Sequence, residues 1–265
     1  MRYLFPYLCS FLVWFLSLEA KAQVTYSRQD SLRVVRLLEK GHESCPEGEN
    51  MGEVVLFYSR QLMGLPYRGQ TLEVNGKQEQ LVVNLQQLDC LALVENVCAL
   101  ALTTAHGSRS WKDYIGWLRK LRYQDGRIDG YKSRNHYFSQ WIQSGTRQGM
   151  MQEVVPSESI SVAMKLNLTY MSEHPASYPL LKTDMKERHL IAEMEKRASG
   201  STVRYIPKER RGSHRAFLDF LRQLVDVNRD AALEGRRLVL VDKAYLCELV
   251  YHCVYLGSFC LGGLL

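Results

Sequence analysis

The sequence lacks the features that mark several common classes of protein. Its 265 residues include only seven cysteines, too few at this length for a fold held together by disulfides. It contains no HExxH and no paired CxxC motif, so no zinc site is predicted. It also has no glycine-rich phosphate loop, internal repeat or low-complexity linker. We therefore expect an ordinary globular protein without a cofactor.

Charge of one sign is only slightly in excess. The chain has 34 Lys and Arg residues against 28 Asp and Glu, a formal net charge of +6. An excess this small and dispersed does not indicate a nucleic-acid partner. The composition, 46% hydrophobic and 23% charged, is that of a globular chain. The length suffices for one large domain or two small ones.

The first 22 residues have the layout of a secretory signal peptide. Arg2 is followed by an apolar stretch over 4–18 and by the small-x-small pattern Ala20-Lys21-Ala22. A membrane anchor or a buried helix is the alternative, but the run is short for a bilayer span. We expect a mature chain that begins at Gln23 and is exported to the periplasm or cell envelope.

Apolar spacing and stop signals predict helices over 28–41, 51–63, 90–104 and 110–124, and a polar helix is expected over 184–199, ending at Gly200. Alternating residues over 70–76 and 79–85, joined by Asn75-Gly76, predict a β-hairpin. Further strands are expected over 159–168 and 202–207. Helices that precede strands and mixed elements indicate an α+β fold.

Cys90 is the clearest candidate for a residue that takes part in chemistry. Asp89 is a good helix N-cap, which places Cys90 in the first turn of a buried helix. Backbone N–H groups and the helix dipole favour a thiolate at this position, and a thiolate can act as an acyl-transfer nucleophile. The alternative is a buried structural cysteine. Cys98, two turns further along the same helix, is expected to pack in the core.

A series of motifs resembles a bacterial family, the N-acetylmuramoyl-L-alanine amidase-like family of the NlpC-type papain-like cysteine peptidases. The resemblance spans about 28–208. The motifs are GLPY (64–67), QTLE (70–73), LVVNL (81–85), LDC with VEN (88–96), RYQDG (122–126), SRNHYF (133–138), LTYM (168–171) and RYIPK (204–208).

The resemblance implies an exported hydrolase that cleaves an amide bond of peptidoglycan, either the sugar-to-peptide link or a link within the stem peptide. It implies a papain-like NlpC-type fold with N-terminal helices and a mainly antiparallel sheet. Cys90 matches the nucleophile and Tyr67 the tyrosine that helps to bind the oxyanion. Arg134, His136 and Tyr137 fall in a motif that could line the substrate groove. The alternatives are a packed aromatic for Tyr67 and a structural polar network for the other three.

The C-terminal part departs from the family pattern. A Gly-Asp strand entry and a His-Val-Gly motif are expected after residue 208, and 209–265 contains neither, only His214 and His252. Residues 245–265 are apolar and could be a membrane span, a buried hairpin or out-of-frame sequence. We therefore divide the chain into 1–22 (signal), 23–208 (hydrolase domain) and 209–265 (atypical tail that leaves the fold incomplete). A non-catalytic module that binds wall peptides stays an alternative function, and resequencing across codons 205–215 would test the frameshift.

Overall fold

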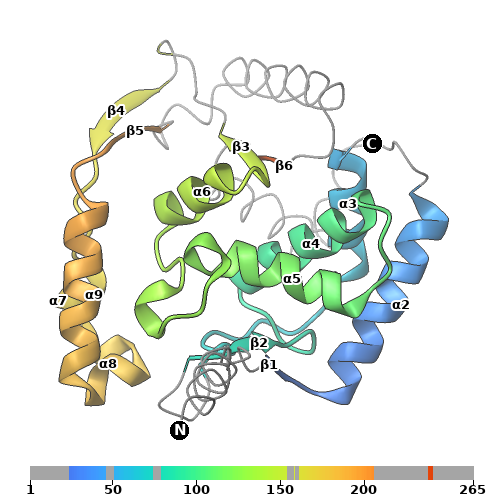
Figure 1. Ribbon diagram of the computed structural model, residues 1–265, viewed down its shortest axis with the longest axis horizontal. Coiled ribbons are helices and arrows are strands. Elements are labelled where there is room, and N and C mark those ends of the chain that lie inside the picture. The colour runs from blue at the N-terminus through green and yellow to red at the C-terminus, as the bar shows by residue number, and fades with distance from the viewer. Residues whose placement is uncertain are drawn as a thin grey trace, which may run out of the picture.

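Helix α4 (Cys90–Ala105) lies at the centre of the fold, and every residue from Ala92 to Thr104 is buried. A helix that is apolar on all sides is stable in water only when other elements cover it. Helices α2, α3 and α5 provide that cover (Figure 1). The computed structural model describes residues 24–45, 51–73, 79–153, 158, 161–205 and 238–240. The predicted signal and nearly all of the predicted tail lie outside these ranges.

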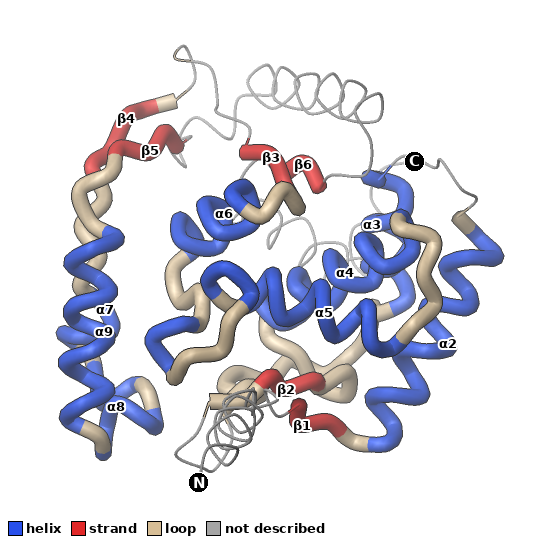
Figure 2. Tube along the Cα trace, in the orientation of Figure 1, coloured by secondary structure: helices blue, strands red, loops and turns tan. Residues whose placement is uncertain are grey.

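Helices dominate the described residues (Figure 2). The remaining α-helices are α2 (Arg28–Ser44), α3 (Met51–Gln61), α5 (Trp111–Arg122), α6 (Phe138–Arg147), α7 (Tyr170–Glu173), α8 (Pro179–Thr183) and α9 (Met185–Ala198). The short 3₁₀ turns are η1 (Gln124–Gly126), η2 (Tyr131–Ser133) and η3 (Pro175–Ser177). All five predicted helices are therefore confirmed, with ends that differ by a few residues, whereas α6, α7 and α8 were not predicted.

Polar caps explain where α2 begins and how it is held. The Ser27 hydroxyl accepts the Asp30 N–H at 3.1 Å, and the Asp30 carboxylate accepts the Ser27 N–H at 3.0 Å. This reciprocal capping box satisfies two N–H groups that a helix start leaves unpaired. The second oxygen of Asp30 accepts the Leu85 N–H at 2.9 Å. One buried carboxylate thus fixes α2 against the segment that leads toward Cys90.

Two of the three strand pairs in the described residues are parallel, which corrects the predicted mainly antiparallel sheet. The strands are β1 (Val24–Tyr26), β2 (Leu81–Val83), β3 (Met151–Glu153), β4 (Val162–Lys165), β5 (Thr202–Tyr205) and β6 (Leu238–Leu240). Strands β1 and β2 pair in parallel, as do β3 and β6, and only β4 and β5 are antiparallel. The helical connection through α2 and α3 permits β1 and β2 to run in the same direction.

The predicted hairpin is wrong over its first strand. Residues 70–72 form turns, and Gln70 has a left-handed backbone with φ 60°. The Glu73 N–H donates to the Gln70 carbonyl at 3.2 Å, a turn contact in place of a strand ladder. Residues 81–83 do form a strand, but its partner is β1. The predicted turn at Asn75-Gly76 lies outside the described residues.

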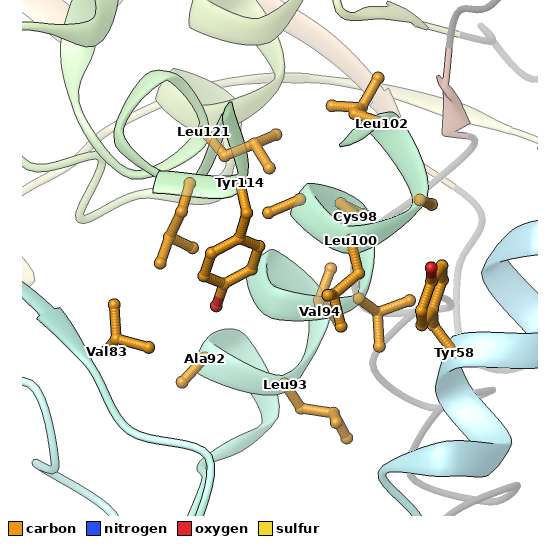
Figure 3. Close-up of a cluster of buried hydrophobic side chains, with 14 of the residues drawn as sticks. Tyr58, Val83, Ala92, Leu93, Val94, Cys98, Leu100, Leu102, Tyr114 and Leu121 are labelled. Carbon is orange, nitrogen blue, oxygen red and sulfur yellow. The ribbon is translucent and has the colours of Figure 1, made fainter. Parts of the chain in front are cut away.

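The main core packs around α4 (Figure 3). Ala92, Val94 and Leu100 of this helix lie between Tyr114 of α5 and Tyr58 of α3. Two tyrosine hydroxyls inside the core are paired. The Tyr58 hydroxyl bonds to Thr104 at 2.5 Å, and the Tyr114 hydroxyl donates to Asn96. Such pairing offsets the cost of taking these groups out of water.

A second, smaller core joins α7, α8 and α9 to the body. It consists of Tyr131, Met171, Leu181, Ile191 and Met194. Tyr131 belongs to η2, so this core connects to the segment that carries the SRNHYF motif. Among the described residues, no helix is both long and apolar enough to cross a membrane.

Candidate active site

Cys90 is the first residue of α4, as predicted. The Asp89 carboxylate accepts the Ala92 N–H at 2.7 Å, which makes Asp89 the N-cap. The Cys90 side chain is partly exposed and is not part of a disulfide. It therefore lies at the positive end of a 16-residue helix, where a negative charge is stabilised. Its side chain is also accessible to molecules in solution. Its role as nucleophile stays a prediction.

Tyr67 lies beside the segment that leads into α4. The Arg68 N–H donates to the Leu88 carbonyl at 3.2 Å, and the Leu88 N–H donates to the Pro66 carbonyl at 3.1 Å. These two bonds pair Tyr67 with Leu88 in a parallel bridge. Since Leu88 lies two residues before Cys90, the structure brings the segments of both predicted catalytic residues together. The Tyr67 side chain is 57% exposed, which fits a surface role better than a packed aromatic.

Cys98 has the opposite environment. It is fully buried, and burial raises the pKa of its thiol to about 12, with the charge of Glu95 adding to the effect. Cys45 is also buried. The prediction that Cys98 packs in the core is confirmed.

We expect a thiol alkylator at pH 8 to label Cys90 in the native protein at least about 100-fold faster than Cys98. A raised thiol pKa leaves little thiolate at this pH, and a fully buried sulfur also excludes the reagent. Mass spectrometry of tryptic peptides over time gives both rates. In urea both cysteines should react alike, which controls for reagent preference. Equal native rates would contradict an accessible, activated thiol at Cys90.

The guanidinium of Arg134 is engaged by two carboxylates. Its Nη1 lies 2.8 Å from Glu73 Oε1, and its Nη2 lies 2.7 Å from Glu79 Oε1. Its Nε also donates to Glu79, at 2.9 Å. These contacts match the structural polar network, the alternative to a substrate ligand. Direct binding of substrate by Arg134 stays a prediction.

His136 and Asn135 also bond to the protein backbone. The His136 Nε2–H donates to the Tyr131 carbonyl at 2.7 Å, and the two rings lie 4.4 Å apart. Burial and the nearby charge of Arg134 lower the pKa of His136 to about 3, so the ring is neutral near pH 7. The Asn135 side chain donates to the Leu121 carbonyl at 3.0 Å. Substrate binding by His136 is an untested prediction.

Because His136 is neutral in the folded protein, we expect the protein to lose stability in mild acid. Its pKa is about 6.5 when unfolded and about 3 when folded, so the unfolded chain binds more protons between these values. Stability should therefore fall as the pH drops below 6.5, by at most about 2 kcal/mol at pH 5. Urea unfolding at pH 7 and pH 5 measures the change. His136→Asn should flatten the dependence, whereas His189→Asn, at an exposed position, should retain it.

Tyr137 is held by a buried carboxylate on α9. Its hydroxyl donates to Glu195, and the Met171 N–H donates to Glu195 at 2.8 Å. Burial and the bond to Glu195 raise the pKa of Tyr137 above its usual value, so its phenol stays protonated. Glu195 thereby joins the start of α6, the start of α7 and α9. The ring of Tyr137 is partly exposed, and its predicted role in binding substrate is likewise untested.

Three acidic partners were missed by sequence reasoning. Glu73 and Glu79 bind Arg134, and Glu195 binds Tyr137. Glu73 is part of the QTLE motif, and this motif was a sequence signal that Glu73 could belong to the site. Glu195 had none, because it looked like one of several charged residues on a polar helix.

Four of the described histidines contact backbone carbonyls, and the fifth contacts a carboxylate. These contacts join His42 to Ser108, His106 to Leu102, His136 to Tyr131, His174 to Tyr170 and His189 to Glu193. His214 and His252 lie outside the described residues. Within the described ranges, no group of three or more His, Cys, Asp or Glu residues could hold a metal ion.

Among the solved structures similar to this chain are proteins from three bacteria. An N-acetylmuramoyl-L-alanine amidase from Bacteroides uniformis is 37% identical, with a TM-score of 0.56 over 60% of this chain and 66% of that one. A protein from Bacteroides fragilis, provisionally described as a xylanase, is 36% identical, with a TM-score of 0.52 over 57% and 65% of the two chains. Protein LPG0564 from Legionella pneumophila, at 20% identity and a TM-score of 0.51 over 70% and 65%, shares the fold. This chain thus spans just under two thirds of each. No curated protein matches it.

The sequence also matches a family model over residues 57–224. This match begins later than the resemblance over 28–208 and continues 16 residues past Lys208, so the first part of the atypical tail still follows the family. The match covers well over half of the 265 residues. The chain therefore belongs to the N-acetylmuramoyl-L-alanine amidase-like family.

Proposed function

We propose that this protein is an exported cysteine hydrolase that cleaves an amide bond of peptidoglycan. The observation that carries the proposal is the position of Cys90 at the capped start of α4, beside the Tyr67 segment. The family and the B. uniformis neighbour support a cell-wall amide as the substrate. Export rests on the signal pattern in residues 1–22, and the papain-like NlpC-type fold rests on the motif series.

The chemistry of such a site is acyl transfer. The Cys90 thiolate attacks the amide carbonyl, a C–S bond forms, and the carbonyl oxygen becomes an oxyanion. The helix start and the Tyr67 hydroxyl are suited to stabilise that charge. The C–N bond then breaks as the amine takes a proton from a histidine, and water hydrolyses the thioester to regenerate the thiolate. The motif expected to carry that histidine is absent from 209–265, whose only histidines are His214 and His252.

The test is to incubate the purified mature chain, from Gln23 onward, with muropeptides and to identify the products by mass. Cleavage of the sugar-to-peptide link releases an intact stem peptide. Cleavage within the stem instead leaves part of the peptide on the sugar. A complete absence of either product, with an active relative as a positive control, would contradict hydrolysis.

A non-catalytic wall-peptide-binding module is the second candidate. The observation in its favour is that 209–265 contains neither the Gly-Asp strand entry nor the His-Val-Gly motif. On this reading the groove binds stem peptides without cutting them. Muropeptide binding by calorimetry that is equal in the parent and in Cys90→Ala, with no turnover by the parent, would select it.

A further inference from the structure

We propose that Arg134 is a positioning residue, which holds the Tyr67-bearing segment 64–73 against the segment that leads to Cys90. The inference rests on the proposed function only in the role given to Tyr67 at the oxyanion. It differs from the idea that Arg134 pairs with a carboxylate of the substrate.

Arg134 bridges the two ends of a short stretch of chain. Glu73 precedes and Glu79 follows residues 74–78, and the two carboxylates lie 2.8 and 2.7 Å from separate nitrogens of the guanidinium. A further contact joins Nη2 to the Leu72 carbonyl at 3.4 Å. Both ends of 74–78 are therefore tied to one side chain. A guanidinium is suited to this because its donors form a rigid planar fork.

The guanidinium is itself held in place by the body of the fold. The guanidinium carbon lies 4.9 Å from the centre of the Tyr131 ring. The backbone of Arg134 pairs with that of Tyr123, at the end of α5. The Tyr123 hydroxyl donates to Glu79 at 2.7 Å. The Arg134 side chain has little freedom to move, because the residue is only 9% exposed. Arg134 can therefore act as a fixed anchor for the more exposed segment 64–73.

The contacts continue from Glu73 to Tyr67 along the segment. The Glu73 N–H donates to the Gln70 carbonyl at 3.2 Å, and the Gln70 side chain donates to the Ser177 carbonyl at 3.2 Å. The Arg68 N–H then donates to Leu88, next to the bridge at Tyr67. Release of Glu73 should loosen this turn and the Tyr67–Leu88 pairing. The two carboxylates would also repel each other without the guanidinium between them.

Hydrogen exchange tests the positioning without any need for turnover. In Arg134→Lys, which keeps the charge but loses the planar fork, the amides of Arg68 and Leu88 should exchange at least about 10-fold faster. The amide of Tyr114 in α5 should be unchanged, which excludes global loosening. Arg147→Lys is the matched control, because Arg147 pairs with Asp125 on an exposed surface. Unchanged exchange at Arg68 and Leu88 would overturn the proposal.

Kinetics separates positioning from direct substrate binding. We expect Arg134→Lys to lower kcat about 10-fold with KM within twofold, and Tyr67→Phe to lower it similarly. The double variant should be no worse than the poorer single variant, because both act on one interaction. A rise in KM that disappears with a stem peptide amidated at its carboxylate would instead identify Arg134 as a substrate ligand and overturn the proposal.

Glu73→Gln is the second variant if Arg134→Lys does not fold. It removes one side of the bridge and leaves the Arg134–Glu79 pair, and it should accelerate exchange at Arg68 alone or at both amides. Exchange equal to that of the parent at both amides would contradict the proposal. If the parent cleaves no muropeptide, the proposed hydrolase function fails, and the exchange rates by themselves still decide the role of Arg134.

Discussion

Cys90→Ala should lower the rate of muropeptide hydrolysis by at least about 1,000-fold. Removal of a covalent nucleophile leaves only the contribution of binding and oxyanion stabilisation. The substitution should leave the fold intact, because Cys90 is partly exposed at the first position of α4 and the Asp89 cap does not involve its side chain. The measurement is kcat/KM from product mass over time, together with circular dichroism for folding.

Cys98→Ala is the matched control for this experiment. It removes the same atoms from the same helix, but at a fully buried position in the core. It should cost some stability, about 1 kcal/mol for a small cavity, and leave kcat/KM of the folded protein within about twofold. Equal activity of Cys90→Ala and the parent would exclude Cys90 as the nucleophile. Equal loss in both variants would point to damage to α4 rather than to chemistry.

Glu95→Leu should destabilise the protein by about 3–5 kcal/mol. Glu95 accepts from Arg122 Nε at 2.8 Å, and the side chains are only 1% and 2% exposed. Loss of the carboxylate leaves the Arg122 charge buried without its partner, and the desolvation cost is then uncompensated. Urea unfolding at pH 7 measures the free energy. A loss of this size is a large part of the stability of a typical domain.

The double variant Glu95→Leu/Arg122→Met should recover most of that loss. Two apolar side chains of similar volume satisfy a buried site about as well as the ion pair does. Arg147→Ala, which breaks the exposed pair with Asp125, should change stability by less than about 1 kcal/mol. A single-variant loss no greater than that of Arg147→Ala would contradict a tightly coupled buried pair. A double variant as unstable as Glu95→Leu would show that other contacts of Arg122, such as its bond to the Val82 carbonyl, dominate.

Sequence reasoning predicted the helices best where local signals agree. In α4 the Asp89 cap and a continuous apolar run point to the same structure, and both are read over a few neighbouring residues. The hairpin over 70–85 failed because the pairing of a strand depends on which distant segment lies beside it. β2 pairs with β1, whose register joins Val24 to Leu81, and nothing near residue 81 indicates that partner.

The SRNHYF motif shows the same limit at the candidate site. Its residue types suit a substrate groove or a structural network equally well, and local sequence does not distinguish them. The partners that bear on the choice are far away along the chain. Glu73 and Glu79 are 61 and 55 residues from Arg134, and Glu195 is 58 residues from Tyr137. Only the folded arrangement reveals that these side chains turn toward the protein.

What the sequence determined by itself is the five longest of the described helices, the position of Cys90 at a capped helix start, and the family. Each depends on short-range patterns of caps, apolar spacing and ordered motifs. The tertiary structure alone decided the parallel strand pairs, the approach of Tyr67 to the Cys90 segment, and the partners of Arg134 and Tyr137. These depend on contacts between segments that become neighbours only when burial of the apolar faces around α4 brings them together.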